Sequence, residues 1–178
     1  MSENLPSEDE AFKLLQRSGC SKEVIKHCEA VAKLASKIAE KVKAKGINVD
    51  LNLVRIGAIL HDIGRSKTHS VHHAIIGAKI ARSYNLPEPI IHIIERHVGG
   101  GITAEEAKIL GWPRGIYEPK TIEEKIVTYA DKLIEGSRVV PLKVTIRKLR
   151  KELGASHPAI KRILMLKREI ESLLKDPS

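Results

Sequence analysis

Residues 51–64 read LNLVRIGAILHDIG, a run of apolar side chains that ends in a histidine and an aspartate. The apolar residues recur at helical spacing, which predicts a helix over residues 51–63. His61 continues the apolar face that contains Val54 and Ala58, and Asp62 follows Ala58 and Ile59 in the same way. A buried carboxylate is costly unless it is paired, hydrogen-bonded or bound to a cation. The segment therefore predicts a polar site within or beside a hydrophobic core.

Helix boundaries recur on both sides of this segment. Three capping-box patterns, in which a hydroxyl and a glutamate satisfy free backbone amides, are Ser7-x-x-Glu10, Thr103-x-x-Glu106 and Thr121-x-x-Glu124. Four glycines stand where a helix is expected to end in a left-handed residue, namely Gly19, Gly46, Gly64 and Gly154. The chain is therefore expected to consist of short helices separated by tight turns.

The patterns predict helices near residues 8–17, 21–44, 51–63, 70–84, 88–97, 103–110, 121–135, 145–153 and 158–175. Strand character is confined to residues 138–146, and Pro141 interrupts it. We expect one all-α domain over residues 1–178. Its core lies in about residues 21–138, and residues 139–178 form basic C-terminal helices packed on that core.

Composition excludes several classes of protein. The 178 residues are 42% hydrophobic and 30% charged, which rules out wholesale disorder. Aromatic residues make up only 3%, so nucleic-acid binding on stacked aromatic side chains is disfavoured. No apolar run is long enough to span a bilayer, and the acidic opening is unlike a signal peptide, which favours a cytoplasmic location. A net charge of +9 permits attraction to phosphate-bearing partners.

Further polar residues stand on apolar helix faces or, in the case of His27, at the margin of one. They are His27, His73, His97 and Asp131. His72 points about 100° away from His73, and His92 falls on the wetter side of its helix with Glu95, so both are expected outside the metal site. A single histidine at a helix margin is usually an ordinary core or surface residue. Four histidines and two aspartates aimed inward are better explained by divalent cations, because Zn, Fe, Mn, Co and Ni accept imidazole and carboxylate ligands. The two cysteines match neither a disulfide framework nor a thiolate metal site.

These motifs resemble the HD superfamily of metal-dependent phosphohydrolases. His61-Asp62-Ile63-Gly64 is similar to its HDIG variant, with His27 as the upstream histidine and Asp131 as the downstream aspartate. His73 and His97 look like the extra ligands of its two-metal members. The resemblance covers roughly residues 21–138. It implies an HD-domain helical bundle with the metal site at its centre.

The resemblance also implies a ligand set and a reaction. His27, His61, Asp62 and Asp131 would hold a first metal, while His73 and His97 would hold a second, with Asp62 bridging. Two divalent transition metals (Fe, Mn, Co, Ni or Zn) would activate a bridging hydroxide for in-line attack on phosphorus. Asp62 is the expected catalytic residue, orienting that water and accepting its proton.

The expected substrate is a small, nucleotide-like phosphomonoester or phosphodiester. Arg65, Lys67, Arg96 and Lys132 adjoin the proposed ligands and are the candidate phosphate-binding residues. Cyclic di-GMP is disfavoured, because Arg96-His97-Val98 replaces the His-His-Glu of the HD-GYP enzymes and no Gly-Tyr-Pro follows. The Gly99-Gly100-Gly101 segment is expected to form a mobile loop at the mouth of the cleft.

Three alternatives remain open from the sequence. A dinuclear iron oxygenase of the same fold would use the same ligands. An RNA-associated binding module would use the basic run 147–151 and the final helix, with its Lys161, Arg162, Lys167 and Arg168. A homodimer would use either of two apolar stripes, which are Val31, Ala35, Ile38 and Val42 in one case and residues 163–174 in the other.

Overall fold

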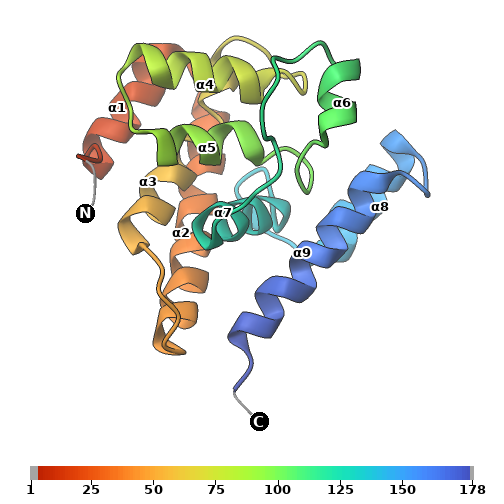
Figure 1. Ribbon diagram of the computed structural model, residues 1–178. Helices are drawn as coiled ribbons and strands as arrows, with labels where there is room; N and C mark the ends of the chain where they lie inside the picture. The colour runs from red at the N-terminus through yellow and green to blue at the C-terminus, as the bar shows by residue number, and fades with distance from the viewer. Residues whose placement is uncertain (1–3, 177–178) are drawn as a thin grey trace.

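The computed structural model describes residues 4–176 and confirms an all-α fold (Figure 1). Its helices are α1 (Glu8–Ser18), α2 (Lys22–Ala44), α3 (Leu51–Leu60), the 3₁₀ helix η1 (Ile63–Ser66), α4 (His73–Ser83), α5 (Glu88–Arg96), α6 (Ala104–Ile109), α7 (Ile122–Lys132), α8 (Leu142–Leu153) and α9 (Pro158–Leu174). Two short strands, β1 (Ile134–Glu135) and β2 (Arg138–Val139), form an antiparallel hairpin. Of the residues 138–146 predicted to have strand character, only 138–139 are strand, and residues 142–146 belong to α8.

The bundle is organised around α2, α3, α5 and α7. Helix α2 packs along α3 and α7, and α5 contacts both α3 and α7. Helix α4 covers α5 and η1, while α9 lies across α7 on the other side (Figure 1). The core consists mainly of Ile, Leu, Val and Ala, as the low aromatic content predicts. Helices α2 and α7 carry His27 and Asp131, and α3 and α5 end just before His61 and His97. These four helices therefore meet near the middle of the molecule.

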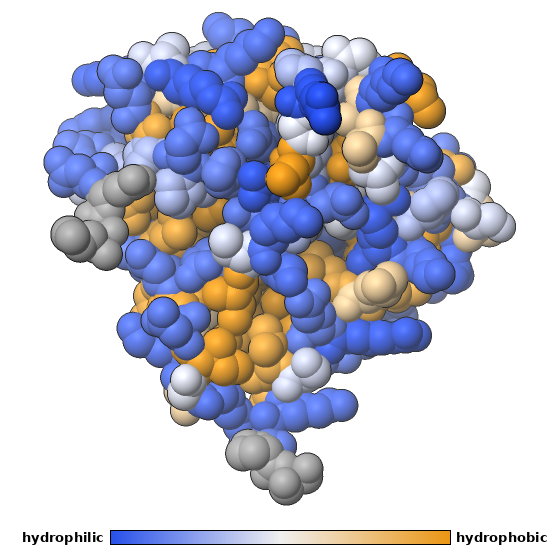
Figure 2. Space-filling model, viewed as in Figure 1, coloured by the Kyte–Doolittle hydropathy of each residue, from blue (hydrophilic) through white to orange (hydrophobic). Residues whose placement is uncertain are grey.

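Both apolar stripes considered for a homodimer are buried inside the single chain. Val31, Ala35 and Val42 are fully buried, and so are Ile163 and Ile170 of α9. These faces supply the core and are not available to a second copy. Hydrophilic residues cover much of the face seen in Figure 2, and apolar residues gather between the lower parts of α3 and α9. No helix within residues 4–176 combines the length and apolarity needed to cross a membrane.

Two of the three predicted capping boxes form. Ser7 with Glu10, and Thr103 with Glu106, exchange both hydrogen bonds. At α7, Thr121 accepts from the backbone of Glu124, but the Glu124 carboxylate accepts from the Lys120 backbone and from an arginine of α5 instead. The reciprocal bond predicted there is therefore wrong.

Gly64 has a different role from the one predicted. Helix α3 ends at Leu60 rather than near residue 63, and Gly64 lies inside η1 without a positive φ. A Cβ at Gly64 would stand 1.8 Å from the carbonyl oxygen of His73 and 2.7 Å from the backbone nitrogen of Gly77. Gly64 is needed because η1 and α4 touch backbone to backbone. Gly77 admits a close neighbour, as its position on the face of His73 predicted.

The Gly99-Gly100-Gly101 segment after α5 packs closely against neighbouring parts of the chain. A Cβ at Gly100 would stand 2.8 Å from Arg162 and Ile163 of α9, and a Cβ at Gly101 would meet Glu118 at the same distance. The expectation of a mobile loop is therefore wrong. The segment instead brings α9 against the chain just after α5.

Replacing Gly64 by alanine tests the contact between η1 and α4. We expect the free energy of unfolding to fall by about 3 kcal/mol, since the new methyl group must push two backbones apart. Gly46→Ala is the control, because Gly46 has a φ of 83° but open space around it, and should cost only about 1–2 kcal/mol. Urea denaturation measures both variants. Equal losses would contradict the close contact.

Candidate metal centre

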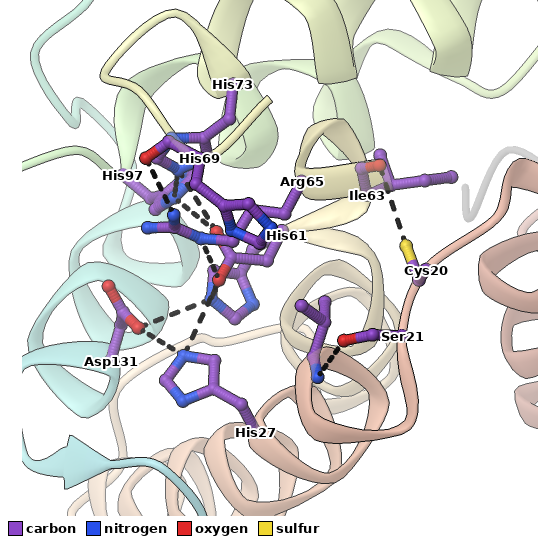
Figure 3. A network of polar contacts seen from close by, with 12 residues as sticks. Cys20, Ser21, His27, His61, Ile63, Arg65, His69, His73, His97 and Asp131 are labelled. Carbon is purple, nitrogen blue, oxygen red and sulfur yellow. Dashed lines mark hydrogen bonds and ion pairs between the residues drawn. The ribbon is translucent and has the colours of Figure 1, made fainter. Parts of the chain in front are cut away.

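The six polar residues singled out in the sequence converge on one place (Figure 3). His27 comes from α2, His61 and Asp62 from the junction of α3 and η1, and His73 from the first turn of α4. His97 directly follows α5, and Asp131 lies in the last turn of α7. Segments more than 100 residues apart in the sequence thus meet at these side chains.

One group of atoms surrounds an oxygen of Asp131. The Nε2 atom of His27 lies 2.9 Å from Asp131 Oδ1, and the Nε2 atom of His61 lies 3.3 Å from the same oxygen. Asp62 Oδ2 is 3.6 Å from both nitrogens. Two imidazoles and two carboxylates therefore present one atom each to a common point.

A second group lies on the other side of Asp62. Its Oδ1 atom is 3.1 Å from His73 Nε2 and 3.2 Å from His97 Nε2, and these two nitrogens are 3.0 Å apart. The two oxygens of Asp62 thus face two different sets of imidazoles. This carboxylate is the element that the two groups share.

Backbone carbonyls fix the tautomer of all four imidazoles. Each Nδ1–H donates to one carbonyl oxygen: His27 to Gly136 at 2.8 Å, His61 to Ala58 at 2.6 Å, His73 to Ser70 at 2.7 Å and His97 to Ile94 at 2.7 Å. A carbonyl can only accept, so the proton of a neutral ring sits on Nδ1. Each Nε2 then directs a lone pair toward the cluster, which is the arrangement of metal-binding histidines.

The cluster contains buried polar atoms without hydrogen-bond partners. His61 Nε2 and Asp62 Oδ1 are buried and have no hydrogen-bond partner. His73 Nε2 and His97 Nε2 approach each other although neither neutral ring carries a proton there. Buried polar atoms left without partners cost about 1–3 kcal/mol each. Divalent cations fit these nitrogen and oxygen atoms, and they would relieve every one of the unpaired positions.

The electrostatics favour the ligand forms of the acidic groups. Burial opposes ionisation of Asp62, but the surrounding imidazoles hold its pKa well below the usual range. Burial likewise opposes ionisation of Asp131, and Lys132 and two imidazoles hold its pKa well below normal. Burial lowers the pKa of His97 to about 4, so this ring is neutral at pH 7. Against the effect of burial, Asp62 raises the pKa of His61 well above its ordinary value. A cation at His61 would therefore displace a proton.

Two of the four predicted phosphate-binding cations lie at the cluster. Lys132 Nζ donates to Asp131 Oδ2 at 2.7 Å and to the His97 carbonyl oxygen at 3.1 Å, which ties the end of α7 to the end of α5. Arg65 Nε donates to Asp62 Oδ2 at 2.9 Å, and its guanidinium also contacts the His69 carbonyl. Lys67 is exposed beyond η1.

Arg96 has another task than the predicted substrate contact. Its guanidinium donates to both carboxylate oxygens of Glu124, at 3.1 and 3.2 Å, and to the Ile116 carbonyl at 3.0 Å. The side chain is buried. Arg96 therefore joins α5 to the start of α7 and stabilises the helices that position the site.

His72 and His92 lie outside the cluster, as their helical phase predicts. His72 is exposed and accepts a hydrogen bond at Nδ1 from Trp112 Nε1, at 2.8 Å. His92 lies on the outer side of α5, near Glu88. Burial raises the pKa of Cys20 to about 11 and also raises that of Cys28, so both remain thiols at neutral pH.

The cluster is open at one edge. The side chains of His27 and Asp131 are 18% and 15% exposed, and that of Arg65 is 30% exposed. His61 and His97 are almost completely buried on the opposite side. A small molecule would therefore reach the cluster past His27, Asp131 and Arg65.

A helical bundle with imidazoles and carboxylates converging at its centre defines a candidate metal-binding domain. The HD domain family matches residues 24–135, more than half of the chain. The protein belongs to the HD domain family. An uncharacterised protein of Methanocaldococcus jannaschii is 50% identical over 156 residues, which cover 88% of this chain and 92% of that protein.

Other similarities extend beyond the core of the domain. The tRNA (cytidine(56)-2'-O)-methyltransferase of Picrophilus torridus is 41% identical over 169 residues, which are 95% of this chain but 48% of the methyltransferase. This chain thus spans about half the length of that enzyme. The HD domain of the L. monocytogenes phosphodiesterase PgpH, solved in complex with cyclic-di-AMP, superposes with a TM-score of 0.56 at 19% identity. The match covers 95% of this chain and 99% of that domain, and it shows a shared fold.

Alanine substitutions separate the histidines inside the cluster from their neighbours. We expect His73→Ala and His97→Ala to lose about one bound transition-metal ion per chain, because each variant removes an Nε2 that faces Asp62. His72→Ala and His92→Ala are the matched controls and should keep their metal. Elemental analysis of each purified protein measures the content. Equal losses in all four variants would show that the cluster is not the metal site.

Proposed function

We propose that this protein is a metal-dependent phosphohydrolase that cleaves a phosphomonoester or phosphodiester bond in a small, nucleotide-like substrate. The observation that carries the proposal is Asp62, whose two oxygens face two separate sets of imidazole nitrogens. Two divalent cations bound there would lower the pKa of a shared water and neutralise charge on the phosphoryl group. Membership of the HD domain family supports this reaction class.

The proposed roles of the protein groups follow from their positions. His27, His61, Asp62 and Asp131 would hold one cation, and His73 and His97 would hold the other together with Asp62. Asp62 lies between the two groups of imidazoles, and from this position we propose that it orients the attacking water and accepts its proton at a carboxylate oxygen.

Cationic side chains lie at the cluster and beside it. Arg65 contacts Asp62 through Nε and is partly exposed, which leaves the rest of its guanidinium for a phosphate oxygen. Lys132 supplies a second positive charge beside Asp131. Lys67 is exposed on the same turn of chain as Arg65, and we propose it as an outer contact.

The nucleotide-like substrate is proposed from the relatives. The PgpH domain with the same fold was solved with cyclic-di-AMP, which is a nucleotide phosphodiester. The methyltransferase relative is named for a tRNA substrate, so an RNA-linked role is the second candidate function. The basic residues of α8 and α9 favour this candidate, because they attract phosphate groups.

Asp62→Asn tests the proposed reaction with little change of shape. We expect turnover to fall at least about 1,000-fold, since the variant removes the charge that both halves of the cluster share. The assay follows products from a panel of nucleotides and 2′,3′-cyclic phosphates with Mn, Fe, Co or Ni. Asp9→Asn, on the exposed face of α1, is the control and should keep full activity.

Two outcomes of that assay would overturn the proposal. Full activity of Asp62→Asn on every substrate that the wild-type protein cleaves would remove Asp62 from the reaction. Oxygen uptake without hydrolysis of any phosphate ester would instead favour the dinuclear iron oxygenase.

A further inference from the structure

A basic groove of 410 Å³ lies between α8 and α9, outside the metal centre. Buried Leu142 and Ile146 form part of its floor and anchor α8 to the protein. Lys143, Arg147 and Arg150 line its rim and are exposed. Their spacing of four and three residues places the three cations on one face of α8. The groove is therefore a fixed concave surface with a row of positive charge.

The row of cations has no acidic partners of its own. Among residues 4–176, no carboxylate lies within ion-pair distance of Lys143, Arg147 or Arg150, whereas the neighbouring Lys148 lies 3.7 Å from Glu135. Lys167 contributes a fourth cation from α9 and pairs with Glu171 on its own helix at 3.0 Å. Like charges at helical spacing repel one another. An anionic ligand would relieve this repulsion.

The dimensions fit a strand of nucleic acid. Residues 143 and 150 are about 10 Å apart along the helix axis, at 1.5 Å per residue. A polyanionic strand laid along α8 could therefore contact all three cations within that length. One guanidinium group can donate two parallel hydrogen bonds to two oxygens of one phosphate. A concave groove also suits a strand better than the flat surface of a membrane.

We propose that this groove binds the phosphate backbone of an RNA strand. The proposal rests on the RNA-linked candidate function and requires neither a metal nor hydrolysis. The groove is also coupled to the metal centre through the chain, because Thr145 Oγ1 of α8 donates to the Lys132 carbonyl at 2.6 Å. Lys132 directly follows Asp131. Helix α8, which would hold the RNA, thus contacts the segment that carries a proposed metal ligand.

The proposal corrects which basic residues face a nucleic acid. Arg162 of α9 was a candidate from the sequence, but it pairs with both oxygens of Glu106, at 2.9 and 2.8 Å, and is largely buried. It fastens α9 to α6. The unpaired cations of α8 are the better candidates.

The test compares two triple variants that each lower the net charge by three. Lys143→Gln/Arg147→Gln/Arg150→Gln removes the row on α8. The control, Lys33→Gln/Lys37→Gln/Lys41→Gln, removes exposed lysines from one face of α2. Binding of an unmodified tRNA transcript is measured by fluorescence anisotropy in EDTA at several salt concentrations. Circular dichroism and thermal melting check that both variants fold.

We expect the α8 variant to bind the transcript at least about tenfold more weakly and to lower the salt slope by about 2, at roughly 0.7 per phosphate contact. The α2 control should bind like the wild-type protein. Single Arg147→Gln should lower the slope by about 0.7, which supports a direct contact without a triple change.

Several outcomes would overturn the proposal. Equally weakened RNA binding by both triple variants would mean that the transcript is attracted by the overall positive charge and not by the groove. Absence of transcript binding by the wild-type protein would exclude the site, and binding of phosphatidylserine vesicles in preference to RNA would assign the groove to a membrane. The α8 variant should still hydrolyse small substrates and Asp62→Asn should still bind RNA, so failure of the groove and failure of the hydrolase are separate results.

Discussion

The shared carboxylate of Asp62 is the constraint on which the rest of the structure depends. Its two oxygens face separate imidazole groups, and it can do so only where α3 stops and η1 turns the chain toward α4. Gly64 and Gly77 permit that turn because they let two backbones touch next to His73. The α3–η1 junction thus fixes the centre of the site.

A second layer of contacts holds the imidazoles in one orientation. Four backbone carbonyls accept from Nδ1, and they come from the last turns of α3 and α5, the loop before α4 and the β1–β2 turn. Lys132 and the buried Arg96–Glu124 pair join the ends of α5 and α7. The helical bundle therefore preorganises the site, although nitrogen and oxygen atoms at its centre have no hydrogen-bond partner.

The sequence was sufficient for the fold class and for the residues that converge. Helical phase placed His61, His97 and Asp131 on apolar faces, and a polar residue on such a face must meet other polar groups. It could not show what Arg96 contacts, because that depends on the position of Glu124 on another helix. The sequence also could not show why Gly64 is required or which carbonyls accept from the imidazoles, since both depend on which backbone segments meet in the fold. The prediction that an apolar stripe forms a homodimer interface was wrong, because an amphipathic pattern does not show whether another helix of the same chain or a second copy covers the apolar face.

Anomalous diffraction from crystals grown with zinc measures the central arrangement most directly. We expect two peaks on opposite sides of Asp62, with Nε2 of His27 and His61 about 2.0–2.1 Å from one and Nε2 of His73 and His97 at the same distance from the other. A single peak, or peaks bound elsewhere while the six side chains keep their present hydrogen bonds, would contradict the shared role of Asp62.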